Sequence, residues 1–120
     1  MASILIIDDE VSIRTLLRRI LDEDGHQIRE AADGHIGLSL YRQAPADVVI
    51  TDILMPERDG LEVTLALTQE FLDARVIAIT GATGDRNYLN VATLFGARRV
   101  IQKPFTPDEI RRAVRYTLAH

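Results

Sequence analysis

ILIIDDE, residues 4–10, is the stretch that decides the fold of this chain. Four consecutive apolar residues, three of them β-branched isoleucines, precede three acidic residues. An unbroken apolar run of this kind is typical of a strand buried on both faces of a parallel sheet, because an exposed face would alternate with polar residues. Similar runs stand at residues 48–50, 76–79 and 100–101, and a weaker strand is expected at residues 27–31.

Helical periodicity fills the segments between these strands. The first segment has the i, i+3, i+4, i+7, i+8 spacing of one buried helix face, formed by Ile13, Leu16, Leu17, Ile20 and Leu21. A second helix is predicted over residues 33–43, a third begins at Gly60, and a fourth covers residues 85–95. Gly37 lies inside the second helix, which it is expected to weaken by about 1 kcal/mol relative to alanine.

The last predicted helix has a clear start signal. Thr106 is the candidate N-cap, Pro107 takes the first helical position, and Glu109 completes a capping box. One apolar stripe follows, formed by Ile110, Ala113, Val114, Thr117 and Leu118. Five strand–helix pairs in succession predict an α/β fold, a doubly wound parallel sheet of five strands with helices on both faces.

Length and composition narrow the class of protein. The 120 residues are expected to form one domain, residues 1–120, without a separate effector domain. No apolar run approaches the roughly 18 residues of a membrane span, the N-terminus does not resemble a signal peptide, and cysteine is absent. We therefore expect a cytoplasmic protein with no membrane association. The net charge of −4 argues against direct nucleic-acid binding.

The charge is distributed unevenly along the chain. Residues 1–96 carry 8 basic and 16 acidic residues, whereas residues 97–120 carry 6 basic and 2 acidic residues. The basic end includes Arg98, Arg99, Arg111, Arg112 and Arg115. These arginines could form a solvated helix face or a docking surface for an acidic partner, and the sequence leaves both interpretations open.

Polar residues follow four of the five predicted strands. They are Asp8, Asp9 and Glu10 after the first strand, Asp52 after the third, Thr80 after the fourth and Lys103 after the fifth. The carboxyl ends of parallel strands share one edge of the sheet, where ligands bind in this class of fold. Each residue alone could be a helix cap or an exposed side chain, but together they indicate one site.

The chemistry of this set points to phosphoryl transfer. Neighbouring carboxylates repel one another, and Mg²⁺, which prefers oxygen ligands and retains several waters, relieves that repulsion. A carboxylate can also attack phosphorus and form an aspartyl phosphate. Mg²⁺, the ammonium group of Lys103 and the hydroxyl of Thr80 could then stabilise the charge on the phosphoryl oxygens.

Four stretches resemble the receiver domains of response regulators, and the resemblance covers the whole chain. They are LIIDDE at 5–10, TDILMPERDG at 51–60, ITGAT at 79–83 and IQKPF at 101–105. The resemblance implies a flavodoxin-like (βα)5 fold with strand order 2-1-3-4-5. It also implies a self-phosphorylating acceptor rather than a turnover enzyme. The implied partners are a histidine kinase or histidine phosphotransfer protein and a downstream output protein or domain.

The resemblance also implies a role for each matching residue. Asp52 would be the phosphorylated residue and, with Asp8 and Asp9, would hold Mg²⁺, Asp9 more directly than Asp8. The backbone carbonyl of Leu54 would be a further metal ligand. Thr80 would be the switch hydroxyl.

At the end of the fifth strand, the resemblance implies that Lys103 binds the phosphoryl group and that the bond before Pro104 is cis. The chain departs from the family pattern at three positions. Val100 stands where the family often has Tyr or Phe, and Leu54 and Ala82 stand at positions that are frequently polar.

Three other functions remain as alternatives. An aspartyl-phosphate hydrolase of the haloacid-dehalogenase type needs an acid two residues after the nucleophile, where this chain has Leu54. A nucleotide- or flavin-binding module would need a phosphate-cradling loop after the first strand, and the only hint is the Gly81–Gly84 pair. A pseudo-receiver would dock partners without phosphorylation, and the intact set of site residues argues against it.

Overall fold

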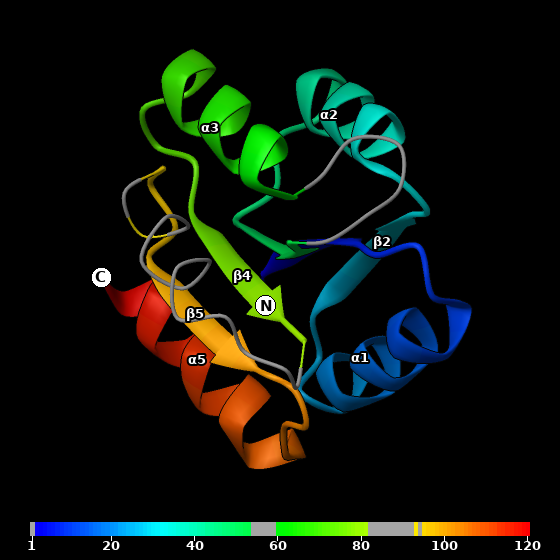
Figure 1. Ribbon diagram of the computed structural model, residues 1–120. Helices are drawn as coiled ribbons and strands as arrows, with labels where there is room; N and C mark the ends of the chain where they lie inside the picture. Colours follow the sequence, from blue (N-terminus) through cyan, green and yellow to red (C-terminus); the bar gives the residue numbers. More distant parts are fainter. Residues whose placement is uncertain (1, 54–59, 82–92, 94) are drawn as a thin grey trace.

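The computed structural model describes residues 2–53, 60–81, 93 and 95–120 (Figure 1). Its elements are β1 (Ser3–Ile7), α1 (Val11–Glu23), β2 (Gln27–Ala31), α2 (Gly34–Gln43), β3 (Val48–Asp52), α3 (Gly60–Glu70), β4 (Val76–Thr80), β5 (Arg99–Gln102) and α5 (Pro107–Ala119). The fourth predicted helix, residues 85–95, lies almost entirely outside the described residues and stays a prediction. None of the described helices is both long enough and apolar enough to cross a membrane.

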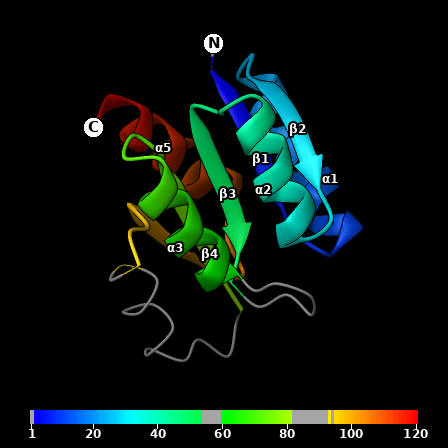
Figure 2. The same cartoon turned by 90° about the horizontal axis from the view of Figure 1, so that it is seen from above.

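The five strands form one sheet in the order β2-β1-β3-β4-β5, and every neighbouring pair is parallel. This order confirms the prediction. Helices α1 and α5 pack together on one face of the sheet, and α2 and α3 pack together on the other (Figure 2). Because β1, β3, β4 and β5 are consecutive neighbours, their carboxyl ends lie side by side at one edge.

Strand β1 shows why its sequence is apolar without interruption. Ile4 and Ile6 belong to the hydrophobic cluster under α1 and α5, whereas Leu5 and Ile7 belong to the cluster under α2 and α3. All four side chains are fully buried. Successive side chains of a strand point to opposite faces, so a central strand covered by helices on both sides needs apolar residues at every position.

Capping side chains mark the starts of α2 and α5. The side chain of Asp33 accepts a hydrogen bond from the backbone N–H of Ile36 at 2.9 Å and so caps α2. At α5, the hydroxyl of Thr106 accepts from the N–H of Glu109, and the carboxylate of Glu109 accepts from the N–H of Thr106. Both α2 and α5 therefore begin where the sequence predicts.

Gly37 has a packing role that its helix propensity does not reveal. A Cβ placed at Gly37 would lie 2.7 Å from Cγ1 of Ile7, whose side chain is fully buried in β1. Helix α2 thus approaches β1 closely at this residue, and alanine does not fit without displacing Ile7. In the folded protein, steric overlap with Ile7 therefore opposes the gain in helix propensity that alanine would bring at this residue.

The buried face of α1 is narrower than its spacing predicts. Leu17, Ile20 and Leu21 are buried, but Leu16 is 39% exposed and Ile13 is only partly buried. The stripe of α5 is buried as predicted, with Leu118 partly buried at its edge. On α1, therefore, two residues predicted to belong to the core border solvent instead.

Candidate functional site

The site residues lie at the ends of four neighbouring strands. Asp52 and Thr80 are the last residues of β3 and β4, and were predicted to follow those strands. The difference arises because the parallel ladder continues to the pairs Asp52–Ile79 and Thr80–Gln102. Lys103 follows β5, and its backbone N–H donates to the carbonyl oxygen of Thr80 at 2.8 Å.

Four acidic residues form one cluster at this edge. Asp8, Asp9, Glu10 and Asp52 each offer a carboxylate oxygen, and these oxygens lie within 4.8 Å of one another. Asp8 and Asp52 are buried, whereas Asp9 and Glu10 are exposed. The cluster therefore has a buried part and a solvent-exposed part. Glu10 lies beside the three carboxylates, Asp8, Asp9 and Asp52, that the resemblance assigns to the metal.

Asp8 is buried with one carboxylate oxygen bonded and the other without a partner. Its Oδ1 accepts a hydrogen bond from the N–H of Glu10 at 2.9 Å, while Oδ2 has no hydrogen-bond partner among the described residues. The pKa of Asp8 is raised to about 6, mainly by burial and in part by the charges of Asp52 and Asp9, against the Glu10 hydrogen bond and the charge of Lys103. A buried carboxylate oxygen without a partner is costly, so this side chain favours a cation or a proton.

Lys103 reaches across the edge to the acidic cluster. Its Nζ lies 3.2 Å from Oδ2 of Asp52 and 3.8 Å from Oε1 of Glu10. Burial alone would lower the pKa of Lys103, but the neighbouring carboxylates, Asp52 above all, raise it. The ammonium group is therefore charged and directed at Asp52. The peptide bond between Lys103 and Pro104 is cis, as the resemblance implies.

This acidic cluster fits Mg²⁺. It offers carboxylate oxygens, the ligand type that the ion prefers, and one of these oxygens is buried without a partner. Asp8, Asp9 and Asp52 are the residues that would hold the ion. The backbone carbonyl of Leu54, the further ligand that the resemblance implies, lies outside the described residues, as does Ala82.

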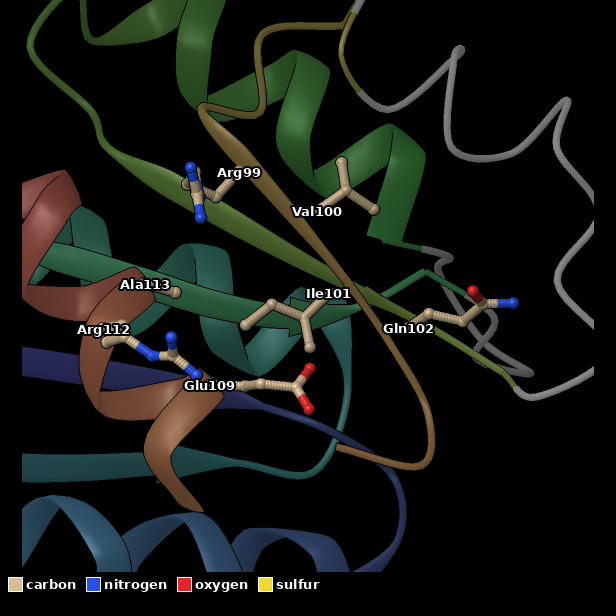
Figure 3. A pocket seen from close by; sticks show the side chains of 7 residues that line it. All are labelled: Arg99, Val100, Ile101, Gln102, Glu109, Arg112 and Ala113. Carbon is tan, nitrogen blue, oxygen red and sulfur yellow. The ribbon is translucent and has the colours of Figure 1, made fainter. Parts of the chain in front are cut away.

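Thr80 and Val100 lie on the same face of the sheet. Thr80 is buried, and Val100 pairs with Ala78, two residues before Thr80 on β4. Val100 packs against the small cluster of Ile53, Ala78 and Ala97. In Figure 3, the side chains of Val100 and Ile101 leave β5 in opposite directions. Val100 is thus a partly buried contact of the core rather than a free surface side chain.

The five arginines of the predicted partner surface separate into two groups. Arg111 and Arg115 form ion pairs with acidic residues at the C-terminal end of α1, Glu23 and Asp24. These two arginines tie α5 to α1 and are partly neutralised.

Of the other three arginines, Arg98 directly precedes β5, Arg99 begins it and Arg112 belongs to α5. Arg98 donates to the backbone oxygen of His120, and the guanidinium of Arg99 lies 4.7 Å from the ring centroid of Tyr116. Arg99 and Arg112 line a pocket between β5 and α5, together with Glu109 and Gln102 (Figure 3). Arg99 and Arg112 thus lie at one pocket, separate from the pairs that Arg111 and Arg115 form with the end of α1.

The structure also shows an apolar pocket beside the acidic cluster, which the sequence did not reveal. It is lined by Ile13, Leu16, Lys103, Pro104 and Phe105. The helical spacing of Ile13 and Leu16 gave no signal for it, because the same spacing describes an ordinary buried face. The pocket places exposed apolar surface next to the amino group that reaches Asp52.

A family profile described as the response regulator receiver domain matches residues 4–115. The sporulation initiation phosphotransferase F of Bacillus subtilis is 35% identical over 112 residues, which cover 93% of this chain and 90% of that protein. The chemotaxis protein CheY of Halobacterium salinarum is 33% identical over 111 residues, 92% of this chain and 92% of that protein.

Longer relatives match over only part of their length. A probable transcriptional regulator of Guillardia theta is 37% identical over 115 residues, which cover 96% of this chain and 44% of that protein. This chain thus spans less than half the length of that curated relative. Among solved structures, a response regulator receiver domain protein from Clostridium thermocellum superposes with a TM-score of 0.93 at 30% identity, covering 99% of this chain and 95% of that one.

Proposed function

The chain belongs to the response regulator receiver domain family, and we propose that it accepts a phosphoryl group on Asp52 in a Mg²⁺-dependent reaction. The donor would be the phosphohistidine of a histidine kinase or of a histidine phosphotransfer protein. The chain would catalyse its own phosphorylation and act as a switch rather than as a turnover enzyme. The observation that carries this proposal is the contact of 3.2 Å between Nζ of Lys103 and Oδ2 of Asp52, beside the partnerless Oδ2 of Asp8.

The proposed step is a displacement at phosphorus. A carboxylate oxygen of Asp52 attacks the phosphorus atom, the P–N bond to the donor histidine breaks, and the imidazole nitrogen keeps the electron pair and takes a proton. Lys103, directed at Asp52, would bind the oxygens of the transferred group. Mg²⁺ held by the acidic cluster would offset the negative charge of the phosphoryl group and of the carboxylates.

The apolar pocket beside Lys103 suggests where the phosphodonor docks. The phosphorus atom must come within bonding distance of Asp52, so the donor protein must cover the edge of the sheet. Ile13, Leu16 and Phe105 offer apolar surface at that edge. Burial of apolar side chains there would contribute affinity without altering the reacting groups.

The output would be a shift between two surface states. The hydroxyl of Thr80 would bond a phosphoryl oxygen, but Val100 has no aromatic ring that could move between solvent and interior. Val100 is also β-branched, with few χ1 rotamers, and is packed against Ala78 and Ala97. We therefore expect the output protein or domain to respond to displacement of backbone near Thr80 and to the charge of Arg98, Arg99 and Arg112.

Labelling with acetyl phosphate tests the proposal. The protein should gain one phosphoryl group that alkali and hydroxylamine remove when Mg²⁺ is present, and none when EDTA is present, as measured by intact mass. Asp52→Asn should abolish the label, since an amide is not a comparable nucleophile. Equal labelling of Asp52→Asn would contradict the assignment, and no label on the parent protein would favour the phosphorylation-independent docking module instead.

A further inference from the structure

The backbone around Asp8 is held by a side chain that belongs to none of the groups described so far. Nη1 of Arg14, in the first turns of α1, donates to the carbonyl oxygen of Asp8 at 2.6 Å. This is a short hydrogen bond from a charged donor, a type about twice as strong as a neutral one. Only 14% of the Arg14 side chain is exposed, so the contact is sheltered from water.

A carboxylate on the edge strand of the sheet orients Arg14 in turn. Nε of Arg14 donates to Oε1 of Glu30 at 3.3 Å. Glu30 precedes Ala31 on β2, and the carbonyl of Ala31 accepts from the N–H of Asp8 at 3.1 Å. The end of β2 therefore holds Asp8 twice, once directly through Ala31 and once through Glu30 and Arg14.

These bonds leave Asp8 with little freedom. Its N–H is bonded to Ala31, its carbonyl to Arg14, and Oδ1 of its carboxylate to the N–H of Glu10. The one polar atom that remains is Oδ2, which is buried and has no partner in the part of the chain that the structure describes. Because the N–H, the carbonyl and Oδ1 of Asp8 are held by hydrogen bonds, the direction of Oδ2 is fixed as well.

We propose that Arg14 is a positioning residue of the cation site: by bonding the Asp8 carbonyl while braced by Glu30, it sets the direction of the Asp8 carboxylate toward the ion. This inference rests on the Mg²⁺ site proposed above. Partners of metal ligands commonly change metal affinity by about 10- to 100-fold when they are removed. Arg14 acts on the ligand and touches neither the ion nor the phosphoryl group.

Arg18 provides a matched control. Its Nε also donates to Glu30, and its second contact is to the carbonyl of Ile28, away from Asp8. Arg14→Met and Arg18→Met each remove one positive charge and one Glu30 contact, but only Arg14→Met loses the bond to Asp8. Loss of a nearby positive charge should by itself strengthen cation binding, so simple electrostatics and positioning predict opposite signs.

The experiment is a Mg²⁺ titration of parent, Arg14→Met, Arg14→Lys and Arg18→Met, followed by the amide NMR signals of Asp8 and Asp9, with urea unfolding of each metal-free protein. We expect Arg14→Met to weaken Mg²⁺ binding by about tenfold or more, and Arg18→Met to leave it unchanged or slightly stronger. Arg14→Lys keeps the charge, but its ammonium group cannot bond Glu30 and the Asp8 carbonyl at once as a planar guanidinium does. The Mg²⁺ affinity of Arg14→Lys should therefore fall between those of the parent and Arg14→Met.

The outcomes separate this inference from the proposed function. If Arg14→Met binds Mg²⁺ as tightly as the parent, or more tightly, Arg14 does not position the site, although the site itself stands. The same conclusion follows from parent-like affinity in Arg14→Lys should Arg14→Met fail to fold. If the parent shows no saturable Mg²⁺ binding, the cation site is wrong, and the role of Arg14 falls with it.

Discussion

Lys103 and Asp52 are 51 positions apart in the chain, yet Nζ of the lysine lies 3.2 Å from Oδ2 of the aspartate. The two residues stand at the ends of β5 and β3, which are separated in the sheet only by β4. The sheet topology therefore brings a cation and a buried carboxylate together without any contribution from local sequence.

Lys103→Met should have opposite effects on Mg²⁺ affinity and on the rate of phosphoryl transfer. Loss of the ammonium group removes a competitor for the carboxylates, so Mg²⁺ should bind more tightly. Labelling by acetyl phosphate should nevertheless slow by roughly 10- to 100-fold, because the group that stabilises the phosphoryl oxygens is gone. Metal titration and the rate of mass gain measure the two effects. Arg112→Met, an exposed cation on α5, is the control, and equal slowing in that variant would contradict the role of Lys103.

Asp8→Asn should stabilise the metal-free protein at neutral pH. The pKa of Asp8 is raised to about 6, above its usual 3.8, so the folded state binds this proton more tightly than the unfolded state. The contribution of Asp8 to stability is therefore full below about pH 4 and is lost as pH rises through 6. In EDTA at pH 8 we expect the free energy of unfolding of Asp8→Asn to exceed that of the parent by roughly 1–2 kcal/mol. This difference should shrink toward pH 4.5.

Urea unfolding at several pH values measures this difference. Added Mg²⁺ should stabilise the parent and leave Asp8→Asn nearly unchanged, since the variant lacks one carboxylate of the site. A parent that is more stable than Asp8→Asn at pH 8 without metal would show that another group satisfies the buried carboxylate.

Leu16→Asp should impair transfer from a protein donor and spare the small-molecule reaction. The substitution puts a charge on the rim of the apolar pocket, where a phosphodonor would bury apolar surface. We expect transfer from a phosphohistidine protein to slow by about tenfold or more, while labelling by acetyl phosphate is unchanged. Leu72→Asp is the control, because Leu72 is 90% exposed and does not line the pocket. Equal rates of protein-donor transfer in both variants would rule out docking at this pocket.

Gly37→Ala should destabilise the fold despite the better helix propensity of alanine. The added methyl group meets the buried side chain of Ile7 at a distance that real Cβ atoms do not show. Overpacking of this kind costs about 1–3 kcal/mol, more than the gain of about 1 kcal/mol in propensity. Urea unfolding checks this. Gly81→Ala is the matched control, because a Cβ there meets no atom within 4 Å; a Gly37→Ala protein as stable as the parent would show that α2 moves away from β1 without penalty.

The features that could be predicted from the sequence are those set within a single strand or helix. Apolar runs mark strands, and Thr106 and Asp33 mark helix starts, because capping and burial of a strand involve few neighbours. The meeting of Asp52 with Lys103 was also predictable, since parallel strands deliver their carboxyl ends to one edge.

Features that depend on distances between elements could not be predicted. The approach of Gly37 to Ile7 and the exposure of Leu16 both reflect how far a helix stands from its neighbours. The pairing of Arg111 with Glu23 across 88 positions has the same origin. Hydrophobic spacing predicts which face of a helix is buried, but it does not predict how much of each side chain on that face remains exposed.

Lys103 is also the single lysine in the chain. Among the side chains, amine-directed reagents therefore have one target, Nζ of Lys103, which is hydrogen-bonded to Asp52. Reductive methylation with ¹³C-formaldehyde would place one side-chain resonance at the reaction centre, without mutation and without a protein partner. The protein thus has a built-in spectroscopic reporter, whose chemical shift follows the charge at Asp52 as ions and phosphodonors are added.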